Sequence, residues 1–227
     1  MSKQAKSGGR QKVSDENVFA AARRAMSRRG PHELTLADIA REAGVTAGRL
    51  VQRFGSKGAL LTALSEHFAG SASATFAELR AAHRTPLATL RAYAMCIADL
   101  APTPDTLLRN LAYLQRDLAD DRLRRHLVEN ARAARREIKS LLKAAVERGE
   151  LRRNVDAAAL ARTVETVMGG SLMCWATYRE GRAADWIARE LDAVVAPWRR
   201  HDRRLRRSQR RRGANRDGDS GSARRIS

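Results

Sequence analysis

Apolar residues recur along most of the chain at the three- and four-residue spacing of amphipathic helices. Ala, Leu, Arg and Glu dominate the composition, aromatic residues make up only 4%, and Gly and Pro fall in clusters rather than at hairpin spacing. The sequence therefore predicts an all-α fold. After three short N-terminal elements, the predicted helices cover residues 58–82, 86–100, 105–118, 120–148, 155–178 and 183–198.

The three short elements have the layout of a helix-turn-helix. Ser14 is placed to cap the first helix. Thr35 opens the second with a capping box in which Asp38 stands where Glu is usual, and Gly44 closes that helix after two turns. Thr46 then caps the third helix, so a tight turn containing glycine joins two short helices.

The third helix divides into two faces when successive residues are placed about 100° apart. Its apolar half, which we expect to pack on the first two helices, holds Ala47, Leu50, Val51 and Phe54. Its other half holds Gly48, Arg49 and Gln52. Arg binds guanine and Gln binds adenine in the major groove, and a missing side chain lets a helix sit deeper there.

Gly48 needs a reason, because a helical Gly costs about 1 kcal/mol relative to Ala. Close approach of DNA is one explanation; an ordinary solvated face with an incidental glycine is the other. The surroundings favour DNA, since Thr35 and Thr46 mark helix N-termini that suit phosphates, and Arg53 and Lys57 supply charge. We therefore expect DNA contacts from Thr35, Thr46, Ala47, Gly48, Arg49, Gln52, Arg53 and Lys57.

Basic charge is concentrated at the two ends of the chain, whose formal net charge is +19. Residues 1–57 carry 12 basic and 5 acidic side chains, residues 58–198 carry 20 and 17, and residues 199–227 carry 12 and 3. Such ends favour nucleic acid as the partner, with an anionic membrane as the weaker candidate, and composition alone does not choose between them. We predict a disordered basic arm (1–13), a helix-turn-helix DNA-binding domain (14–57), a helical regulatory and dimerisation domain (58–198) and a disordered Arg-rich tail (199–227).

The sequence gives little support for a membrane protein, a secreted protein, a metal or redox protein, or an enzyme. No apolar segment approaches the roughly 18 residues of a membrane span, and the polar N-terminus does not resemble a secretory signal. Cys96 and Cys174 match no metal or redox spacing, which predicts two buried thiols in a reducing cytoplasm. No zinc-protease motif, phosphate loop or nucleophile elbow is present, so we expect no enzymatic activity, no cofactor and no metal.

Several features between Val18 and Leu64 occur together at a specific spacing. They are the Ala21-Ala22 pair, Gly30, Thr35 followed by Asp38-Ile39-Ala40, the Ala43-Gly44-Val45 turn, and Phe54 followed by Ser56-Lys57 and Leu60. This run resembles the N-terminal DNA-binding domain of the TetR family of bacterial transcriptional regulators. The chain departs from the family at Val51, where a phosphate-contacting tyrosine is common, and at Arg49, where a small hydroxyl residue is common.

The resemblance implies that the C-terminal helices form a ligand pocket and that the last two build a dimer interface. Methionine, cysteine and aromatic side chains suggest pocket candidates: Tyr93, Cys96, Tyr113, Met168 and Cys174. Small residues that permit close helix approach, with large apolar anchors, suggest interface candidates: Gly169, Gly170, Leu172, Trp175 and Trp186. For both sets the alternative is that the side chains belong to the intrachain core.

The sequence thus predicts a ligand-responsive transcriptional regulator. We expect a repressor that binds a palindromic operator in double-stranded DNA as a homodimer and is released by a small molecule, without membrane association. Two alternatives stay open: a ligand-dependent activator, and a nucleic-acid-binding protein that is indifferent to sequence and driven by the Arg-rich tail.

Overall fold

The structure, a computed structural model, describes residues 13–69 and 71–200, so nearly all of the predicted basic arm and tail lies outside it. Within these ranges the chain forms ten α-helices and a closing 3-10 turn with no strand, which confirms the all-α prediction. The elements are α1 (Asp15–Met26), α2 (Leu36–Ala43), α3 (Ala47–Phe54), α4 (Lys57–Phe68), α5 (Ser71–Ala82), α6 (Pro86–Asp99), α7 (Pro104–Ala119), α8 (Asp121–Glu147), α9 (Ala157–Tyr178), α10 (Ala183–Val195) and η1 (Ala196–Trp198).

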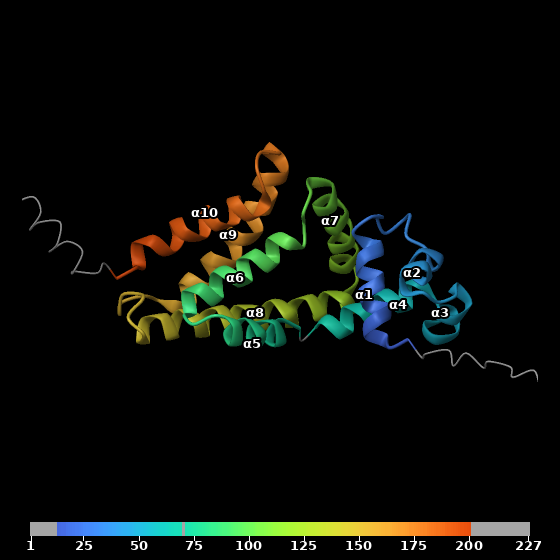
Figure 1. Cartoon of the computed structure of the whole chain (residues 1–227), viewed down its shortest axis with the longest axis horizontal. Coiled ribbons are helices and arrows are strands. Elements are labelled where there is room, and N and C mark those ends of the chain that lie inside the picture. Colours follow the sequence, from blue (N-terminus) through green and yellow to red (C-terminus); the bar gives the residue numbers. More distant parts are fainter. Residues whose placement is uncertain (1–12, 70, 201–227) are drawn as a thin grey trace, which may run out of the picture.

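Helices α1 to α4 form a small head at one end of an elongated molecule (Figure 1). Ser14, Thr35 and Thr46 cap its first three helices as predicted, each hydroxyl accepting the backbone N–H three residues further on. The buried cluster of the head also includes leucines of α4, among them Leu60 and Leu64. The head therefore continues past residue 57, where the predicted domain boundary lay.

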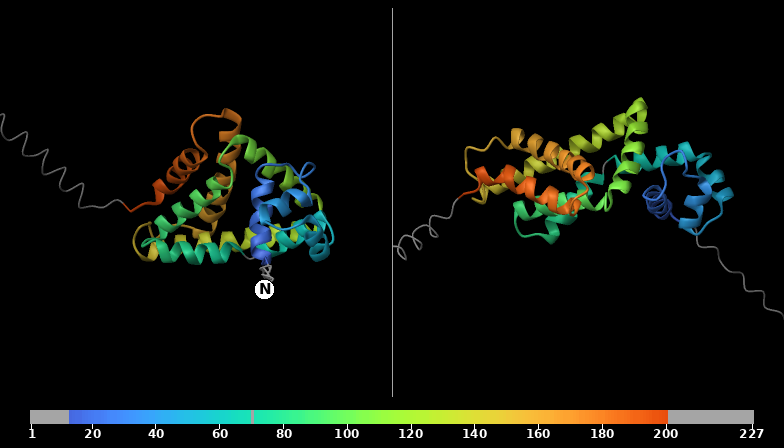
Figure 2. Two further views of the ribbon diagram at one scale, coloured as in Figure 1. Left: turned by 45° about the vertical axis from the view of Figure 1, so that its right-hand side comes forward. Right: turned by 90° about the horizontal axis from the view of Figure 1, so that it is seen from above.

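Helices α5 to α10 form the body around a second, larger core. The longest helix, α8, runs from the head to the opposite end of the body and packs against α4, α5, α6, α7 and α9, while α9 and α10 lie side by side (Figures 1 and 2). The single helix predicted for residues 58–82 is wrong, because α4 ends at Phe68 and α5 begins at Ser71. The break separates the helix that completes the head from the first helix of the body.

The chain leaves the body at the end opposite the head. The last predicted helix stops at Val195 and gives way to η1. Arg199 then pairs with Leu151 in an isolated antiparallel β-bridge, and the backbone N–H of Arg200 donates to the carbonyl oxygen of Glu150 at 3.0 Å. Arg199 and Arg200, expected in the tail, therefore belong to the body.

The structure also bears on two expectations from the sequence, the absence of a membrane span and the burial of both thiols. Among residues 13–69 and 71–200, no helix combines the length and the apolar character needed to cross a membrane. Cys96 is partly buried but Cys174 is exposed on α9, so the expectation of two buried thiols is wrong for Cys174.

Candidate nucleic-acid interface

Local backbone features fix α3 on the surface of the head. Gly44 adopts a left-handed conformation with φ of 67°, which turns the chain sharply between α2 and α3. The Thr46 hydroxyl caps α3 by accepting the N–H of Arg49 at 3.3 Å. Leu50, only 1% exposed, anchors the inner side of α3 in the core of the head. The opposite side of this two-turn helix consequently faces solvent.

The outward face of α3 carries the predicted base-reading residues. Gly48 and Gln52 are exposed, Arg49 is partly exposed, and Arg49 and Gln52 line an open hollow that also includes Val13, Ser14 and Arg53. A Cβ added at Gly48 would meet no other atom within 4 Å. The packing of the chain itself therefore gives no reason for a glycine here, although glycine weakens a helix.

Val51 does not face inward as predicted. Its side chain is 48% exposed, whereas Leu50 is the single fully buried residue of α3. A short helix at the edge of the head buries a narrower stripe than half its circumference, and Val51 falls outside that stripe. The family position that commonly holds tyrosine is thus occupied here by an exposed, shorter apolar side chain.

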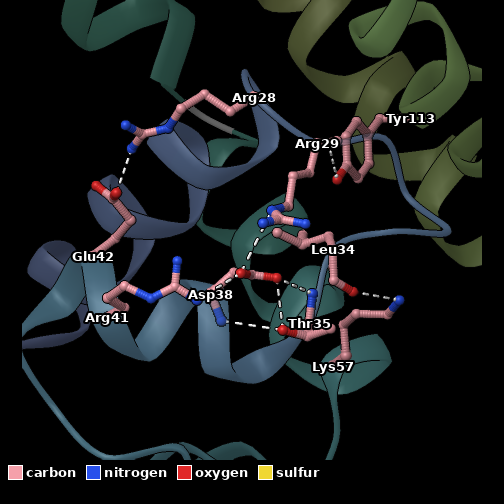
Figure 3. Close-up of polar contacts among 9 residues, drawn as sticks. All are labelled: Arg28, Arg29, Leu34, Thr35, Asp38, Arg41, Glu42, Lys57 and Tyr113. Carbon is pink, nitrogen blue, oxygen red and sulfur yellow. Dashed lines mark hydrogen bonds and ion pairs between the residues drawn. The ribbon is translucent and has the colours of Figure 1, made fainter.

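Two predicted phosphate contacts are engaged within the chain. The Arg53 guanidinium donates to the Val13 carbonyl oxygen at 2.6 Å and forms a 2.6 Å ion pair with Asp15, which ties α3 to the start of α1. The Lys57 ammonium donates to the carbonyl oxygens of Pro31 and Leu34 at 2.9 and 2.8 Å. Lys57 therefore holds the segment between α1 and α2 (Figure 3).

A charged network organises the N-terminus of α2 (Figure 3). Asp38 is 7% exposed and accepts hydrogen bonds from the Thr35 hydroxyl at 2.6 Å and the Thr35 N–H at 3.0 Å. It also forms ion pairs with Arg29 and Arg41 at 3.5 and 2.9 Å. The Thr35 hydroxyl bond is the main cause that lowers the pKa of Asp38, against the opposing effect of burial. Thr35 is thus a structural cap whose hydroxyl is already bonded within the chain.

Helix α7 of the body is hydrogen-bonded to the segment of the head that follows α1. The Tyr113 hydroxyl donates to the Arg29 carbonyl oxygen at 2.9 Å, and the Arg109 Nε donates to the Ser27 carbonyl oxygen at 2.8 Å. Tyr113 is 4% exposed and belongs to the buried cluster of the head. Burial raises its pKa to about 12. Tyr113, predicted from the sequence to line a pocket, therefore joins head to body through this hydrogen bond.

The other pocket candidates lie on α6 and α9 and differ in burial. Tyr93 is partly buried on α6, where its ring lies 4.2 Å from that of Phe76, and Cys96 lies one turn further along. Burial raises the pKa of Tyr93. Met168 is buried in the core of the body at 4% exposure, whereas Cys174 is on the surface. Met168 belongs to the core cluster of the body against which Tyr93 packs.

The candidates for the dimer interface also differ in burial. Trp175 is 3% exposed, and its Nε1 donates to the Gly181 carbonyl oxygen, so it belongs to the intrachain core and is unavailable to a partner. Leu172 and Trp186 are partly buried. Gly169 and Gly170 are exposed on α9, and a Cβ added at either would meet no atom within 4 Å.

One hollow of the body was not anticipated from the sequence. It has a volume of about 480 Å³ and lies between the first turns of α6 and the end of α10. Its charged lining residues are Arg91, Glu150, Asp192, Arg199 and Arg200. These residues come from three distant stretches of chain, so no local pattern in the sequence could have grouped them.

Comparisons with known proteins address the fold and the family. A family model for "Bacterial regulatory proteins, tetR family" matches residues 18–64, and one for "Tetracyclin repressor-like, C-terminal domain" matches residues 113–191. No match was found among curated proteins.

Among solved structures, the chain is similar to a TetR transcription regulator from Haloarcula marismortui, with 16% identity, a TM-score of 0.66, and coverage of 82% of this chain and 98% of that one. A TetR transcriptional regulator from Streptomyces coelicolor has 22% identity, a TM-score of 0.63, and coverage of 83% and 100%. SmeT, the repressor of the multidrug efflux pump SmeDEF of Stenotrophomonas maltophilia, has 21% identity, a TM-score of 0.58, and coverage of 83% and 92%. At these identities the likeness shows the fold.

Proposed function

The chain belongs to the TetR family of bacterial regulatory proteins, and from this premise we propose that it is a ligand-responsive repressor. In this proposal a cytoplasmic homodimer binds a palindromic operator in duplex DNA, and a small molecule releases it. The protein has no catalytic role. Membership of the family makes it a transcriptional regulator with a DNA-binding helix-turn-helix.

The DNA-binding part of the proposal rests on the outward face of α3, where Gly48 has no side chain. Gly48 is exposed in open space, so its missing side chain serves no contact of the chain with itself. A helix in the major groove must come close to the base edges, and a glycine at this point shortens the distance for its neighbours. Arg49 and Gln52 stand beside it with side chains suited to guanine and adenine.

The homodimer part of the proposal rests on exposed glycines of α9, which lie in open space as Gly48 does. Gly169 and Gly170 lie on its exposed side with free space above them, and Met173 near them is 49% exposed. Such a surface allows the backbone of a second helix to approach closely. A two-fold dimer through this face would hold two copies of α3 about one turn of DNA apart, roughly 34 Å, and would read an inverted repeat.

Release by a ligand requires a connection between body and head. Tyr113 and Arg109 of α7 hold the carbonyl oxygens of the segment after α1, and Arg122 of α8 pairs with Glu66 of α4. A ligand that binds one arrangement of the body better than the other shifts the orientation of the heads. We place the effector in the body and propose that its binding lowers operator affinity.

Selection of bound sites from random duplex DNA tests the proposal most directly. The purified full chain should enrich an inverted repeat, and a chain ending at Arg200 should enrich the same motif because α3 is untouched. Arg49→Ala combined with Gln52→Ala should lower affinity for the selected site by at least about 10-fold, since each lost base contact costs about 1–3 kcal/mol.

Arg84→Ala with Gln115→Ala provides the matched control, because it removes the same two residue types from exposed positions on the body. The control should bind the selected site like the unaltered chain. Enrichment of no motif would overturn sequence-specific regulation in favour of indifferent binding. A small molecule that binds tightly yet leaves operator affinity unchanged at fixed salt would overturn release by that ligand.

A further inference from the structure

Val51 of α3 is an apolar side chain that the head leaves in solvent. It is 48% exposed, whereas the other large apolar side chains among residues 13–69 are buried or partly buried. Its neighbour Ala47 packs against the core of the head, but Val51 does not belong to that cluster. Valine also has a lower helix propensity than alanine or leucine, because a helix restricts its branched side chain. The fold of the head therefore gives no reason for a valine here.

Val51 lies on the opposite side of Gly48 from the two side chains proposed to read bases. At about 100° per residue, Val51 is about 60° from Gly48 in one direction around α3. Gln52 and Arg49 are about 40° and 100° from it in the other direction. Helix α3 is at the outer end of the head, and all four residues are exposed or partly exposed (Figure 1). Its outward face therefore has an apolar edge and a polar edge, separated by a residue without a side chain.

The surroundings of Val51 on α3 are small and uncharged. Residues four positions apart are neighbours on a helix surface, so Val51 lies between Ala47 and Gly55. Ala47 is partly buried and Gly55 is exposed, and a Cβ added at Gly55 would meet no atom within 4 Å. The hollow that Arg49 and Gln52 line does not include Val51. The apolar edge is thus open to an approaching surface and offers that surface no charge.

The chemistry of valine limits what Val51 can recognise in DNA. Its side chain has no hydrogen-bond donor for a phosphate and extends only one bond beyond Cβ. A tyrosine, common at this position in the family, carries its hydroxyl much further from the helix. Because Gly48 lets α3 sit deep in the groove, the two methyl groups of Val51 would come close to base edges.

The base edges of the major groove offer a specific partner for such a side chain. Most of their features are hydrogen-bond donors and acceptors, which suit Arg49 and Gln52. The C5 methyl group of thymine is the apolar feature among them, and small apolar side chains contact it. An exposed valine beside two polar readers therefore complements a thymine.

We propose that Val51 determines part of the operator sequence by packing against the C5 methyl group of a thymine in each half-site. The inference rests on the proposed operator-binding function and deepens it, because it names a base feature that the operator must contain. Arg49 and Gln52 read hydrogen-bonding groups from the polar edge of α3, and Val51 reads a methyl group from the apolar edge.

Replacing thymine by uracil in the selected operator tests the proposal, since this change removes the methyl group and leaves base pairing intact. Each thymine of the half-site is replaced in turn, in both half-sites, and the Kd is measured at fixed salt. One thymine of the half-site should be sensitive to the loss of its methyl group. Burial of one methyl group accounts for about 4-fold in affinity, so replacement in both half-sites should weaken binding about 15-fold.

Val51→Ala identifies the side chain that reads the methyl group. The variant should fold, because Val51 is exposed and alanine is the stronger helix former. It should bind the thymine and uracil operators equally, both more weakly than the unaltered chain binds the thymine operator. Leu100→Ala is the matched control, since Leu100 is 49% exposed at the end of α6. The control should keep the affinity of the unaltered chain and its full sensitivity to uracil.

A rescue with 5-methylcytosine separates the methyl group from the rest of the base. Replacing the sensitive thymine–adenine pair by cytosine–guanine removes the methyl group, and 5-methylcytosine restores it at the same ring position. The unaltered chain should bind the methylated operator about 4-fold more tightly than its unmethylated counterpart. Val51→Ala should not distinguish the two.

Three outcomes would overturn the assignment to Val51. They are an operator without a methyl-sensitive thymine, equal uracil sensitivity in Val51→Ala and the unaltered chain, and equal loss of affinity on every sequence in Val51→Ala. The last would show contact with the sugar–phosphate backbone. Site selection separates this inference from the proposed function: an enriched motif without a methyl-sensitive thymine removes the role of Val51 alone, whereas enrichment of no motif removes sequence-specific binding as a whole.

Discussion

The head and the body differ in how far the fold itself uses their distinctive residues. In the head, Gly48 of α3 lies in open space, although nothing in the packing of the chain requires glycine there. In the body, Trp175 and Met168 of α9 are buried in the intrachain core, whereas Gly169 and Gly170 of the same helix lie in open space as Gly48 does. An unusual residue therefore indicates a partner only where the fold itself has no use for it. Residue type alone did not distinguish these cases; contact geometry does.

Replacing Trp175 tests the body side of this comparison and should have the largest effect. Trp175→Ala removes a side chain that is 3% exposed together with its hydrogen bond to Gly181. The free energy of unfolding should fall by about 3–5 kcal/mol, measured by chemical denaturation. Trp186→Ala, at a partly buried position, should cost less. If Trp175→Ala instead weakens dimerisation at unchanged stability of the chain, Trp175 is an interface residue after all.

Tyr113 tests the junction between the two regions. Tyr113→Phe removes the hydrogen bond to the Arg29 carbonyl oxygen and should cost about 1–2 kcal/mol of unfolding free energy. The folded state raises the pKa of Tyr113 to about 12, so its contribution to stability is complete below about pH 10, the ordinary tyrosine value. Between there and about pH 12 the unfolded state ionises first, and stability falls.

Denaturation at neutral pH and at about pH 11 measures this effect. Between the two conditions the unaltered chain should lose more stability than Tyr113→Phe does, because the variant lacks the titrating group. Tyr178→Phe is the control, since Tyr178 is 64% exposed. Equal losses in all three proteins would contradict a buried Tyr113 at the junction.

The sequence predicted local features well and distant ones poorly. The caps Thr35 and Thr46 and the turn at Gly44 depend on a few neighbouring residues, so their pattern was sufficient. The break between α4 and α5 had only Gly70 as a signal, and glycine is also tolerated inside helices. The roles of Tyr113 and Lys57 depend on carbonyl oxygens more than twenty residues away, which no periodicity reveals.

Thr35 tests whether the head's predicted phosphate contacts are structural. Its hydroxyl accepts the Asp38 N–H and donates to the Asp38 carboxylate. Thr35→Ala should lower the free energy of unfolding by about 1 kcal/mol through loss of the cap. The pKa of Asp38 should also rise toward its ordinary value, because its main stabilising bond is gone. The pKa shift is measurable by NMR titration of the carboxyl group, and an unchanged pKa would show that the charged neighbours dominate instead.

Gly48 gives the smallest change in stability and the sharpest test of the comparison, because its two effects have opposite signs. Since an added Cβ meets open space, Gly48→Ala should leave the fold intact and stabilise α3 by up to about 1 kcal/mol. In the proposed complex the same methyl group would lie between α3 and the floor of the major groove, so affinity for the selected operator should fall. Gly169→Ala is the counterpart in the body: it also adds a methyl group in open space on a helix, and should weaken dimerisation, and with it operator affinity, without changing which bases are preferred. A Gly48→Ala chain that is more stable and binds its operator equally well would show that the glycine is incidental, because neither the fold nor the DNA would then require the missing side chain.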